Sequence, residues 1–307
     1  MTESNPPELP AFRSRFGGFW TDLGNAGQLL QAKLELGTIT ESQADQLAFW
    51  IEHGYLVIDD AVPGDVIDRV NEDVERAWRG GLPSVWVEHW EDHKLLVEPV
   101  GPEFKDKPNK LLDLFVGSVI TRQAMFAEPI REFLSLVFER PPMAFQSLSF
   151  LRGTGQPIHQ DTAYVVVDSP MELAASWIAL EDVTPGSGPL EYYDGSHRIP
   201  EFLFDGKQRN IPEGSTEHES FLRHLHEQAL HLGLERKSLR AKKGGALIWS
   251  ADLAHGGSQD ITEGSSRRSL VTHYCPAGVR PAYFSYTRHT DPIPHDTGAY
   301  YCHMLRG

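Results

Sequence analysis

The chain has 307 residues, of which 40% are hydrophobic and 23% are charged, a composition typical of globular proteins. Its formal net charge of −15 repels phosphate backbones and no basic stripe offsets it, so we expect no nucleic-acid partner. Because the sequence has no apolar run of membrane-spanning length, no signal-peptide pattern and only Cys275 and Cys302 as cysteines, we also expect no membrane partner and a cytoplasmic location.

The N-terminal part, up to about residue 142, predicts a helical flank that follows a flexible tail at 1–10. Thr40 and Ser42 can cap a helix whose apolar residues recur at helical spacing, and Gly54 ends it. In chain order we predict a helix within 11–36, this capped helix, a strand at 55–58, a helix at 64–79, an irregular stretch at 80–109 and a helical segment at 111–137, interrupted near Glu128 and Pro129.

The irregular stretch at 80–109 contains Trp86, Trp90 and several prolines. A loop of this length is usually functional or disordered. Two interpretations stay open. The stretch is either a surface excursion or a lid that forms one wall of a substrate pocket, and in the second case Trp86 and Trp90 line that pocket.

Strands dominate the rest of the chain. We predict them at about 144–151, 158–167, 173–181, 189–193, 245–250 and 268–275, with one helix at 216–232. Glycine and proline turns separate these short strands, which indicates a β-sandwich or barrel. Residues 11–307 are therefore expected to form one domain, with a β core at about 143–276 and a C-terminal extension at 277–307.

His159 and Asp161 stand two positions apart at the start of the predicted strand at 158–167. Residues i and i+2 of a strand project from the same face, so the imidazole and the carboxylate point into the same space. One more histidine would complete a 2-His-1-carboxylate set, the ligands of non-haem Fe(II) oxygenases. The same triplet recurs at His289 and Asp291, but prolines follow it and little chain remains to supply another ligand, so the first pair is favoured.

The expected third ligand is His255, which follows the predicted strand at 245–250. Two glycines come directly after it and leave room beside its imidazole. A lone histidine in such a place is more often structural. The His159 and Asp161 pair upstream and the basic residues downstream favour the metal ligand instead.

Two other histidine groupings compete with this set. The predicted helix at 216–232 contains His226-Glu227, but a zinc-protease motif would need a second histidine where Leu230 stands. A solvated helix face explains these histidines better. The second grouping, His89 and His93, lies in the irregular stretch, where no strand supports it.

Several motifs occur in a characteristic order: Gly54-Tyr55-Leu56-Val57-Ile58, Ile158-His159-Gln160-Asp161, Trp177, Gly188-Pro189-Leu190, Gly195-Ser196-His197, His255-Gly256-Gly257-Ser258 and Arg267. In this order and spacing, the sequence resembles the phytanoyl-CoA dioxygenase family of Fe(II)/2-oxoglutarate-dependent oxygenases, over about residues 40 to 276. The resemblance implies a mainly β fold with flanking helices and a double-stranded β-helix (jelly-roll, cupin-like) core. It also implies a catalytic domain that uses Fe(II), bound by His159, Asp161 and His255, with 2-oxoglutarate and O2.

The resemblance further implies which residues hold 2-oxoglutarate. An arginine suits the far carboxylate because its guanidinium pairs with carboxylates bidentately and stays charged. Arg267 and Arg268 are both available, only one of them can point inward, and alignment on the strand that follows favours Arg267. The other expected residues are Gln146, Trp177, for which plain core packing is the alternative, and Ser258.

The expected reaction is hydroxylation of a small molecule, a metabolite or natural-product intermediate, with release of succinate and CO2. Asp161 favours it over halogenation, because related halogenases have a small residue at that position. The acidic bulk argues against an acyl-CoA substrate, since only Lys242-Lys243 and Arg236-Lys237 offer charge. The residues expected to enclose the substrate are Tyr164, Trp86, Trp90, Phe284 and Tyr286.

Two alternatives stay open. One is a cupin-like metalloenzyme that does not use 2-oxoglutarate, which would tolerate loss of Arg267. The other is a non-catalytic ligand-binding barrel, which would form no succinate.

Overall fold

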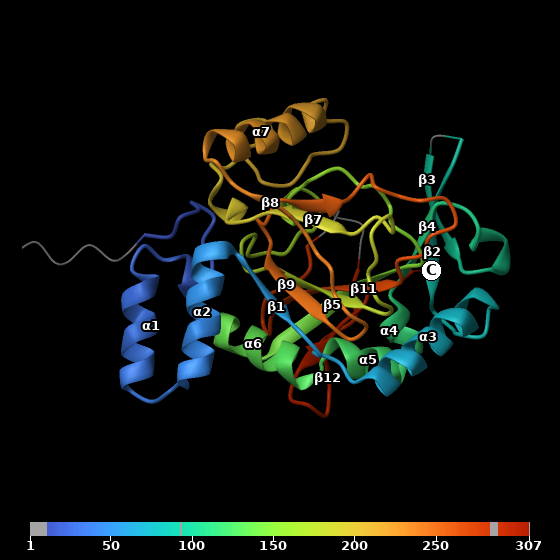
Figure 1. Cartoon of the computed structure of the whole chain (residues 1–307), viewed down its shortest axis with the longest axis horizontal. Helices are drawn as coiled ribbons and strands as arrows, with labels where there is room; N and C mark the ends of the chain where they lie inside the picture. The colour runs from blue at the N-terminus through green and yellow to red at the C-terminus, as the bar shows by residue number, and fades with distance from the viewer. Residues whose placement is uncertain (1–10, 93, 283–287, 307) are drawn as a thin grey trace, which may run out of the picture.

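The computed structural model describes residues 11–92, 94–282 and 288–306, and two sheets dominate it (Figure 1). The small sheet has the order β10 (His255–Gly257), β7 (Leu190–Tyr193), β8 (Arg236–Ser238). The large sheet has the order β1 (Tyr55–Ile58), β9 (Ala246–Ser250), β6 (Ala174–Ala179), β11 (Ser269–Pro276), β5 (Pro142–Phe150), β4 (Asn109–Leu112), β2 (Trp86–Glu91), β3 (Lys94–Pro99).

The two sheets pack face to face. A hydrophobic cluster between them combines Trp177, Trp249 and Val271 from the large sheet with Leu190 and Tyr192 from the small one. The described strand pairs are antiparallel, except that β13 (Tyr300–Tyr301) runs parallel to β5 and also pairs with β12 (Ile293–Pro294). The fold is thus a double-stranded β-helix with a large antiparallel sheet and flanking helices, as the sequence predicts.

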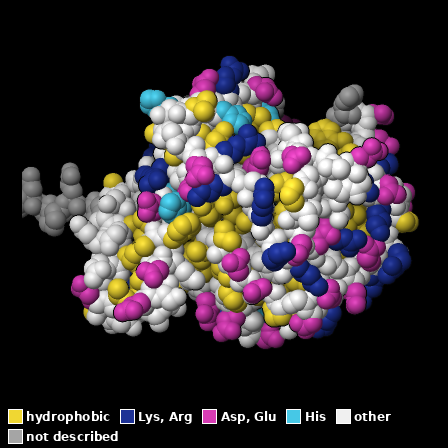
Figure 2. Space-filling model, in the orientation of Figure 1, with side chains coloured by type: hydrophobic (Ala, Val, Ile, Leu, Met, Phe, Trp, Pro, Cys, Tyr) yellow, Lys and Arg dark blue, Asp and Glu magenta, His cyan; other side chains and the backbone are white. Residues whose placement is uncertain are grey.

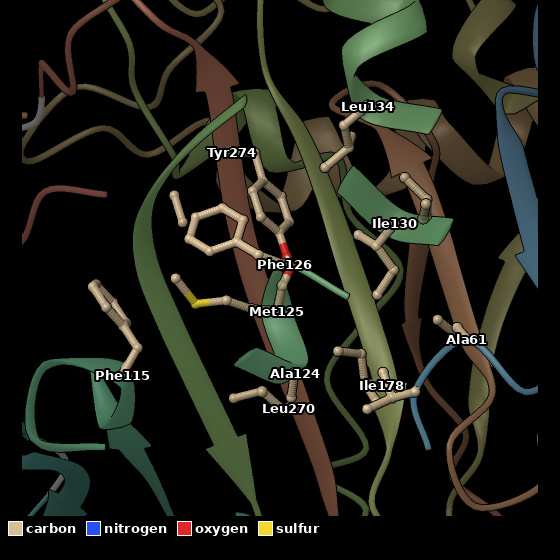
Figure 3. Close-up of a cluster of buried hydrophobic side chains, with 14 of the residues drawn as sticks. Ala61, Phe115, Ala124, Met125, Phe126, Ile130, Leu134, Ile178, Leu270 and Tyr274 are labelled. Atoms are coloured by element: carbon tan, nitrogen blue, oxygen red, sulfur yellow. Dashed lines mark hydrogen bonds between the residues drawn. The ribbon is translucent and has the colours of Figure 1, made fainter. Parts of the chain in front are cut away.

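Helices cover the outer face of the large sheet (Figure 1). Figure 3 shows side chains of α5 and α6 meeting Ile178, Leu270 and Tyr274 from the strands in one apolar cluster, and the Tyr274 hydroxyl donates to the Met125 carbonyl at 2.7 Å. Burial of such side chains is the main source of stability here. The helices are α1 (Ala26–Glu35), α2 (Glu41–His53), α3 (Gly64–Trp78), α4 (Leu114–Gly117), α5 (Val119–Met125), α6 (Glu128–Phe138) and α7 (His218–His231), the last of which lies beside the small sheet.

The start of the fold follows the sequence signals closely. Thr40 accepts from the Gln43 amide, and the Gln43 side chain accepts from the Thr40 amide, so a capping box begins α2. Gly54 ends this helix with φ of 79° and leads directly into β1. The predicted strands near 144, 173, 189, 245 and 268 and the helices at 64–79 and 216–232 are also present, within a few residues.

Three local predictions were wrong. The predicted strand at 158–167 is instead an isolated bridge at His159, a 3-10 turn, η3 (Asp161–Ala163), and a second isolated bridge at Val167. The stretch at 80–109 is not irregular, because β2 and β3 form a hairpin there. The segment at 111–137 begins with the end of β4 and not with a helix. The helix predicted within 11–36 is present at 26–35, after a short 3-10 turn, η1 (Trp20–Asp22).

The predicted division into a helical flank and a β core is less sharp in the structure. Four strands of the large sheet, β1 to β4, come from the part before residue 142, and β13 from the C-terminal extension joins the same sheet. The predicted tail at 1–10 lies outside the described residues. Among the helices that the structure describes, none combines the length and apolar character that a membrane crossing requires.

The contact between Gly54 and His197 gives a stability prediction. A Cβ at Gly54 would lie 2.3 Å from Nδ1 of His197, whereas a Cβ at Gly37, which also has positive φ, would meet nothing within 4 Å. Left-handed backbone costs an alanine about 1 kcal/mol at either site. Because of the added clash, we expect Gly54→Ala to lower the free energy of unfolding by at least about 1 kcal/mol more than Gly37→Ala in urea titrations. Equal losses would contradict a tight contact at His197.

Candidate metal centre

Three buried side chains converge between the two sheets: His159, Asp161 and His255. Their ligand atoms all lie within 4.8 Å of one another, and Nε2 of each histidine is 3.8 Å from Oδ1 of Asp161. The backbones of His159 and His255 exchange two hydrogen bonds of 2.8 Å, which holds the two imidazoles side by side. Within the described ranges, no other group of three or more His, Cys, Asp or Glu side chains has a metal-binding arrangement.

Each imidazole is oriented by a carbonyl of its own loop. Nδ1 of His159 donates to the Pro157 carbonyl at 2.8 Å, and Nδ1 of His255 donates to the Leu253 carbonyl at 2.9 Å. This tautomer makes both Nε2 atoms acceptors that can bind a metal, and in the structure Nε2 of His159 lies 3.3 Å from Nε2 of Gln156. Burial, helped by the neighbouring His255, lowers the pKa of His159 to about 4, so its imidazole is neutral at pH 7, as metal ligation requires.

Asp161 stays ionised although it is buried. Burial alone would raise its pKa, but His255, His273 and His159 together outweigh this effect, and the pKa lies below its ordinary value. Oδ1 faces the two ligand histidines, while Oδ2 accepts from Nε1 of Trp249 at 2.8 Å. Two neutral imidazoles and one carboxylate on one face, with outer hydrogen bonds to hold them, are a donor set that fits Fe(II).

The three side chains line a cavity of about 690 Å³. Its floor is one face of the large sheet, where alternate residues of neighbouring strands point the same way. His273 of β11 stands opposite Gln146 of β5, and Leu148 of β5 stands opposite Leu112 of β4. Beyond β4, the floor continues over Trp86 and Glu88 of β2 and Leu95 and Val97 of β3.

Arg267 and Arg268 lie in different surroundings. Arg267 is only 3% exposed and lines the cavity, with its guanidinium 5.6 Å from the ring centre of Trp177. Burial lowers its pKa to about 10, so it remains charged at pH 7, yet among the described residues no carboxylate pairs with it. Arg268 is outside the cavity lining and pairs with Glu75 at 2.8 Å.

Only some of the other predicted site residues line the cavity. Gln146, Trp177, Tyr164 and Trp86 line the cavity. Trp90, at 59% exposed, belongs to the outer end of the hairpin and is not among the lining residues, so that expectation is corrected. The hydroxyl of Ser258 accepts from the Asp260 amide and is likewise outside the lining, while Phe284 and Tyr286 are outside the described residues.

The competing histidines serve other contacts. Nε2 of His89 bonds with Glu98 at 2.6 Å inside the β2–β3 hairpin, and His93 lies outside the described residues. On α7, Nδ1 of His226 is 3.0 Å from the Tyr193 hydroxyl. His289 forms an isolated backbone bridge with Met304 and does not belong to the group of three converging side chains.

The sequence reasoning missed two residues of the site, Trp249 and His273. Trp249 holds Asp161, and His273 places Nε2 at 3.7 Å from Oδ2 of the same carboxylate. The signal for His273 was strand alternation, because it shares parity with Arg267 and Val271, and all three line the cavity. No local pattern points to Trp249, since its contact depends on how strand β9 and the loop that carries Asp161 approach each other.

Comparison with known proteins agrees with this site. The family model described as phytanoyl-CoA dioxygenase (PhyH) matches residues 50–269. The chain belongs to this family. It is an iron- and 2-oxoglutarate-dependent oxygenase of the PhyH family, and it is 21% identical over 250 residues to the human protein "Phytanoyl-CoA dioxygenase, peroxisomal", a match that covers 76% of this chain and 68% of the human one.

Solved structures show the same fold at low sequence identity. The 2-oxoglutarate-dependent epimerase SnoN from nogalamycin biosynthesis has a TM-score of 0.60 at 15% identity, covering 87% of this chain and 99% of its own. The carbocyclase SnoK of the same pathway has 0.59 at 14% identity, covering 81% and 89%. EctD from S. alaskensis, solved with 2-oxoglutarate and 5-hydroxyectoine, has 0.56 at 17% identity, covering 80% and 78%.

Two buried histidines make the metal-free protein sensitive to acid. Burial lowers the pKa of His197 to about 3 and that of His159 to about 4, against about 6.5 in the unfolded chain. Below pH 6.5 the unfolded state therefore binds protons that the folded state does not, and stability falls as the pH drops towards 4. The loss is about 1 kcal/mol per pH unit for each histidine.

The variant His197→Gln tests this, because glutamine keeps a donor for the Ile51 carbonyl but does not titrate. Urea titrations of the metal-free protein at several pH values should show a slope that is smaller by about 1 kcal/mol per pH unit in the variant. Identical slopes in the two proteins would contradict the prediction.

Proposed function

We propose that this protein is an Fe(II)/2-oxoglutarate-dependent dioxygenase that hydroxylates a small molecule, with Fe(II) bound by His159, Asp161 and His255. The observation that carries the proposal is Arg267, a buried guanidinium without a carboxylate partner among the described residues, in the cavity that the three ligands line. A buried charge needs a counter-charge, and a dicarboxylate cosubstrate supplies one. When bound, iron and 2-oxoglutarate supply the oxidising chemistry, with release of succinate and CO2.

Different residues of the chain would bind different parts of 2-oxoglutarate. Arg267 would pair with the far carboxylate of 2-oxoglutarate, because its guanidinium matches a carboxylate bidentately. Gln146 and Trp177 line the same cavity and would contact the cosubstrate there. Ser258 does not enter this assignment, since it is not among the residues that line the cavity.

Asp161 supports hydroxylation over halogenation. A halide would need the metal position that this carboxylate is placed to occupy, and Trp249 holds the carboxylate in place. The proposed outcome at the substrate is therefore hydroxylation or a related oxidation.

The cavity walls support a small-molecule substrate over an acyl-CoA. Lys110 at the wall pairs with Glu88 at 2.7 Å, and Arg306 pairs with Asp113. The four basic residues noted in the sequence also have acidic partners, which leaves them less available to a phosphate. Lys242 pairs with Asp182, Lys243 with Asp68, Arg236 with Glu191 and Lys237 with Asp194. On the face in Figure 2, basic side chains lie among acidic ones, which does not suit the phosphates of coenzyme A.

The names of similar structures point in the same direction. SnoN was solved with Fe3+, α-ketoglutarate and nogalamycin RO, and EctD with 2-oxoglutarate and 5-hydroxyectoine, all small molecules apart from the metal. Aromatic and apolar side chains that line this cavity, such as Trp86, Leu95 and Tyr164, would contact such a substrate. Efficient turnover of a long-chain acyl-CoA would contradict this part of the proposal.

The role of Arg267 can be tested against its neighbour. Arg267→Ala should raise the Kd for 2-oxoglutarate at least about 30-fold, which corresponds to about 2 kcal/mol for removing one partner of a buried charge pair. Arg268→Ala should leave this Kd unchanged, because Arg268 pairs with Glu75 outside the cavity lining. Anaerobic titration of the Fe(II) protein with 2-oxoglutarate measures both. An unchanged Kd in Arg267→Ala would favour a metalloenzyme that does not use 2-oxoglutarate.

The proposed function itself is tested by Fe(II) binding and by succinate release. The wild-type protein should bind Fe(II), and His159→Ala and His255→Ala should each bind it much more weakly, because each loses one of three ligands. A succinate-release screen over a metabolite library, with Fe(II) and ascorbate and with His159→Ala as the blank, then identifies the substrate. Equal Fe(II) binding by wild type and both variants would overturn the metal assignment.

A further inference from the structure

A buried arginine, Arg209, joins the two loops that carry the metal ligands. It lies between η4 (Ser196–Arg198) and α7 and is only 5% exposed. Its Nη2 donates to Oδ1 of Asp252, to Oγ1 of Thr162 at 3.1 Å and to Oε1 of Gln160 at 3.3 Å. None of these four residues is among those that line the cavity, so this group, which we term the Arg209 network, is separate from the binding site.

The network is adjacent to the ligands in sequence. Gln160 stands between His159 and Asp161, Thr162 follows Asp161, and Asp252 is three residues before His255. The odd-numbered side chains of the first loop face the metal position, while the even-numbered ones contact Arg209 and Asp252. The loop is thus held from the side opposite to the metal.

The hydrogen bonds form a closed set. Nε2 of Gln160 donates to the Asp252 carbonyl at 2.7 Å, and Oγ1 of Thr162 donates to Oδ1 of Asp252 at 2.7 Å. Gln160 and Thr162 therefore each donate to Asp252 and accept from Arg209. Because all four side chains are buried, water cannot replace a lost partner without rearrangement, and the set fixes one geometry.

We propose that Arg209 is a positioning residue, which sets the placement of the His159 and Asp161 loop relative to the His255 loop and thereby the affinity of the site for Fe(II). This inference rests on the proposed function. Backbone hydrogen bonds join the two loops on one side of the ligands, where His159 pairs with His255 and the Gly257 amide donates to the Gln156 carbonyl at 2.8 Å. The Arg209 network joins them on the other side, where Gln160 and Thr162 contact Asp252, so the ligands are held from both sides. Outer residues that orient metal ligands typically change metal affinity 10- to 100-fold when they are removed.

The test measures Fe(II) binding directly. Arg209→Lys keeps the charge, but its ammonium group ends one bond short of the Nη2 position from which all three hydrogen bonds are made. Arg209→Met with Asp252→Asn removes both charges of the buried pair, and the carboxylate that then loses a partner is Glu201, 3.8 Å from Nη1 of Arg209. We expect each protein to bind Fe(II) about 10- to 100-fold more weakly than wild type in anaerobic titrations. The visible absorption of the Fe(II)–2-oxoglutarate complex should also change, because the ligand geometry changes.

Two controls separate positioning from general stability. Leu134→Ala weakens the apolar cluster in Figure 3, away from the metal, so it should lower Tm and leave the Kd for Fe(II) unchanged. Arg223→Met removes an exposed arginine of α7 and should change neither. If Leu134→Ala loses as much Fe(II) affinity as Arg209→Lys at a similar Tm, the effect is one of stability and the proposal is wrong.

The remaining outcomes are also decisive. If the Arg209 variants do not fold, Thr162→Val removes the two hydrogen bonds of the Thr162 hydroxyl and keeps the ion pair between Arg209 and Asp252, and it should show a smaller loss of Fe(II) affinity at nearly wild-type Tm. Wild-type affinity in Arg209→Lys, or in Thr162→Val, would overturn the positioning role. Failure of the wild-type protein to bind Fe(II) would instead overturn the proposed function.

Discussion

The backbone pair between His159 and His255 is the contact on which the site depends. It brings together two loops almost a hundred positions apart, and each histidine then turns its Nε2 inward by donating Nδ1–H to its own loop. Such close approach leaves no room for side chains, since a Cβ at Gly256 would lie 2.6 Å from the Gln156 carbonyl oxygen. The glycine after His255 is therefore a condition for the metal geometry and not a mere spacer.

Local signals in the sequence were sufficient to predict those elements whose ends are marked by a capping residue, a glycine or a clear alternation of side chains. The capping box at Thr40, the helix stop at Gly54 and the alternation of the inner strands all predict what the structure contains. The β2–β3 hairpin was not predicted, because its residues mix charges and prolines with aromatics. Its partner β4 was not predicted either, because its residues lie at the start of a segment with a helical pattern. The valine run after Asp161 suggested a strand. In the structure, Gln160 and Thr162 form hydrogen bonds within the Arg209 network, which favours a turn there.

The site itself was predictable where chemistry limits the choice of residue. Two imidazoles, one carboxylate and one arginine are distinctive enough to be found by spacing and family resemblance. Trp249 and Asp252 were not, because their roles are set by long-range contacts to neighbours of the ligands. The acidic surface also says little about the interior: the net charge of −15 is screened over about 8 Å at physiological salt, while Arg267 acts at contact distance.

The strand order of the large sheet means that two different groups of strands line the cavity. His255 belongs to β10 of the small sheet, and His159 pairs with it. Trp177 lies on β6 and Arg267 just before β11, two inner strands of the large sheet, whereas β4, β2 and β3 extend the floor outward and end at a sheet edge. Edge strands can change length or side chains without disturbing the pairing of inner strands. The metal centre and the proposed substrate surface therefore lie on separate strands, so that a change in the length or the side chains of a single hairpin can alter the second without disturbing the first.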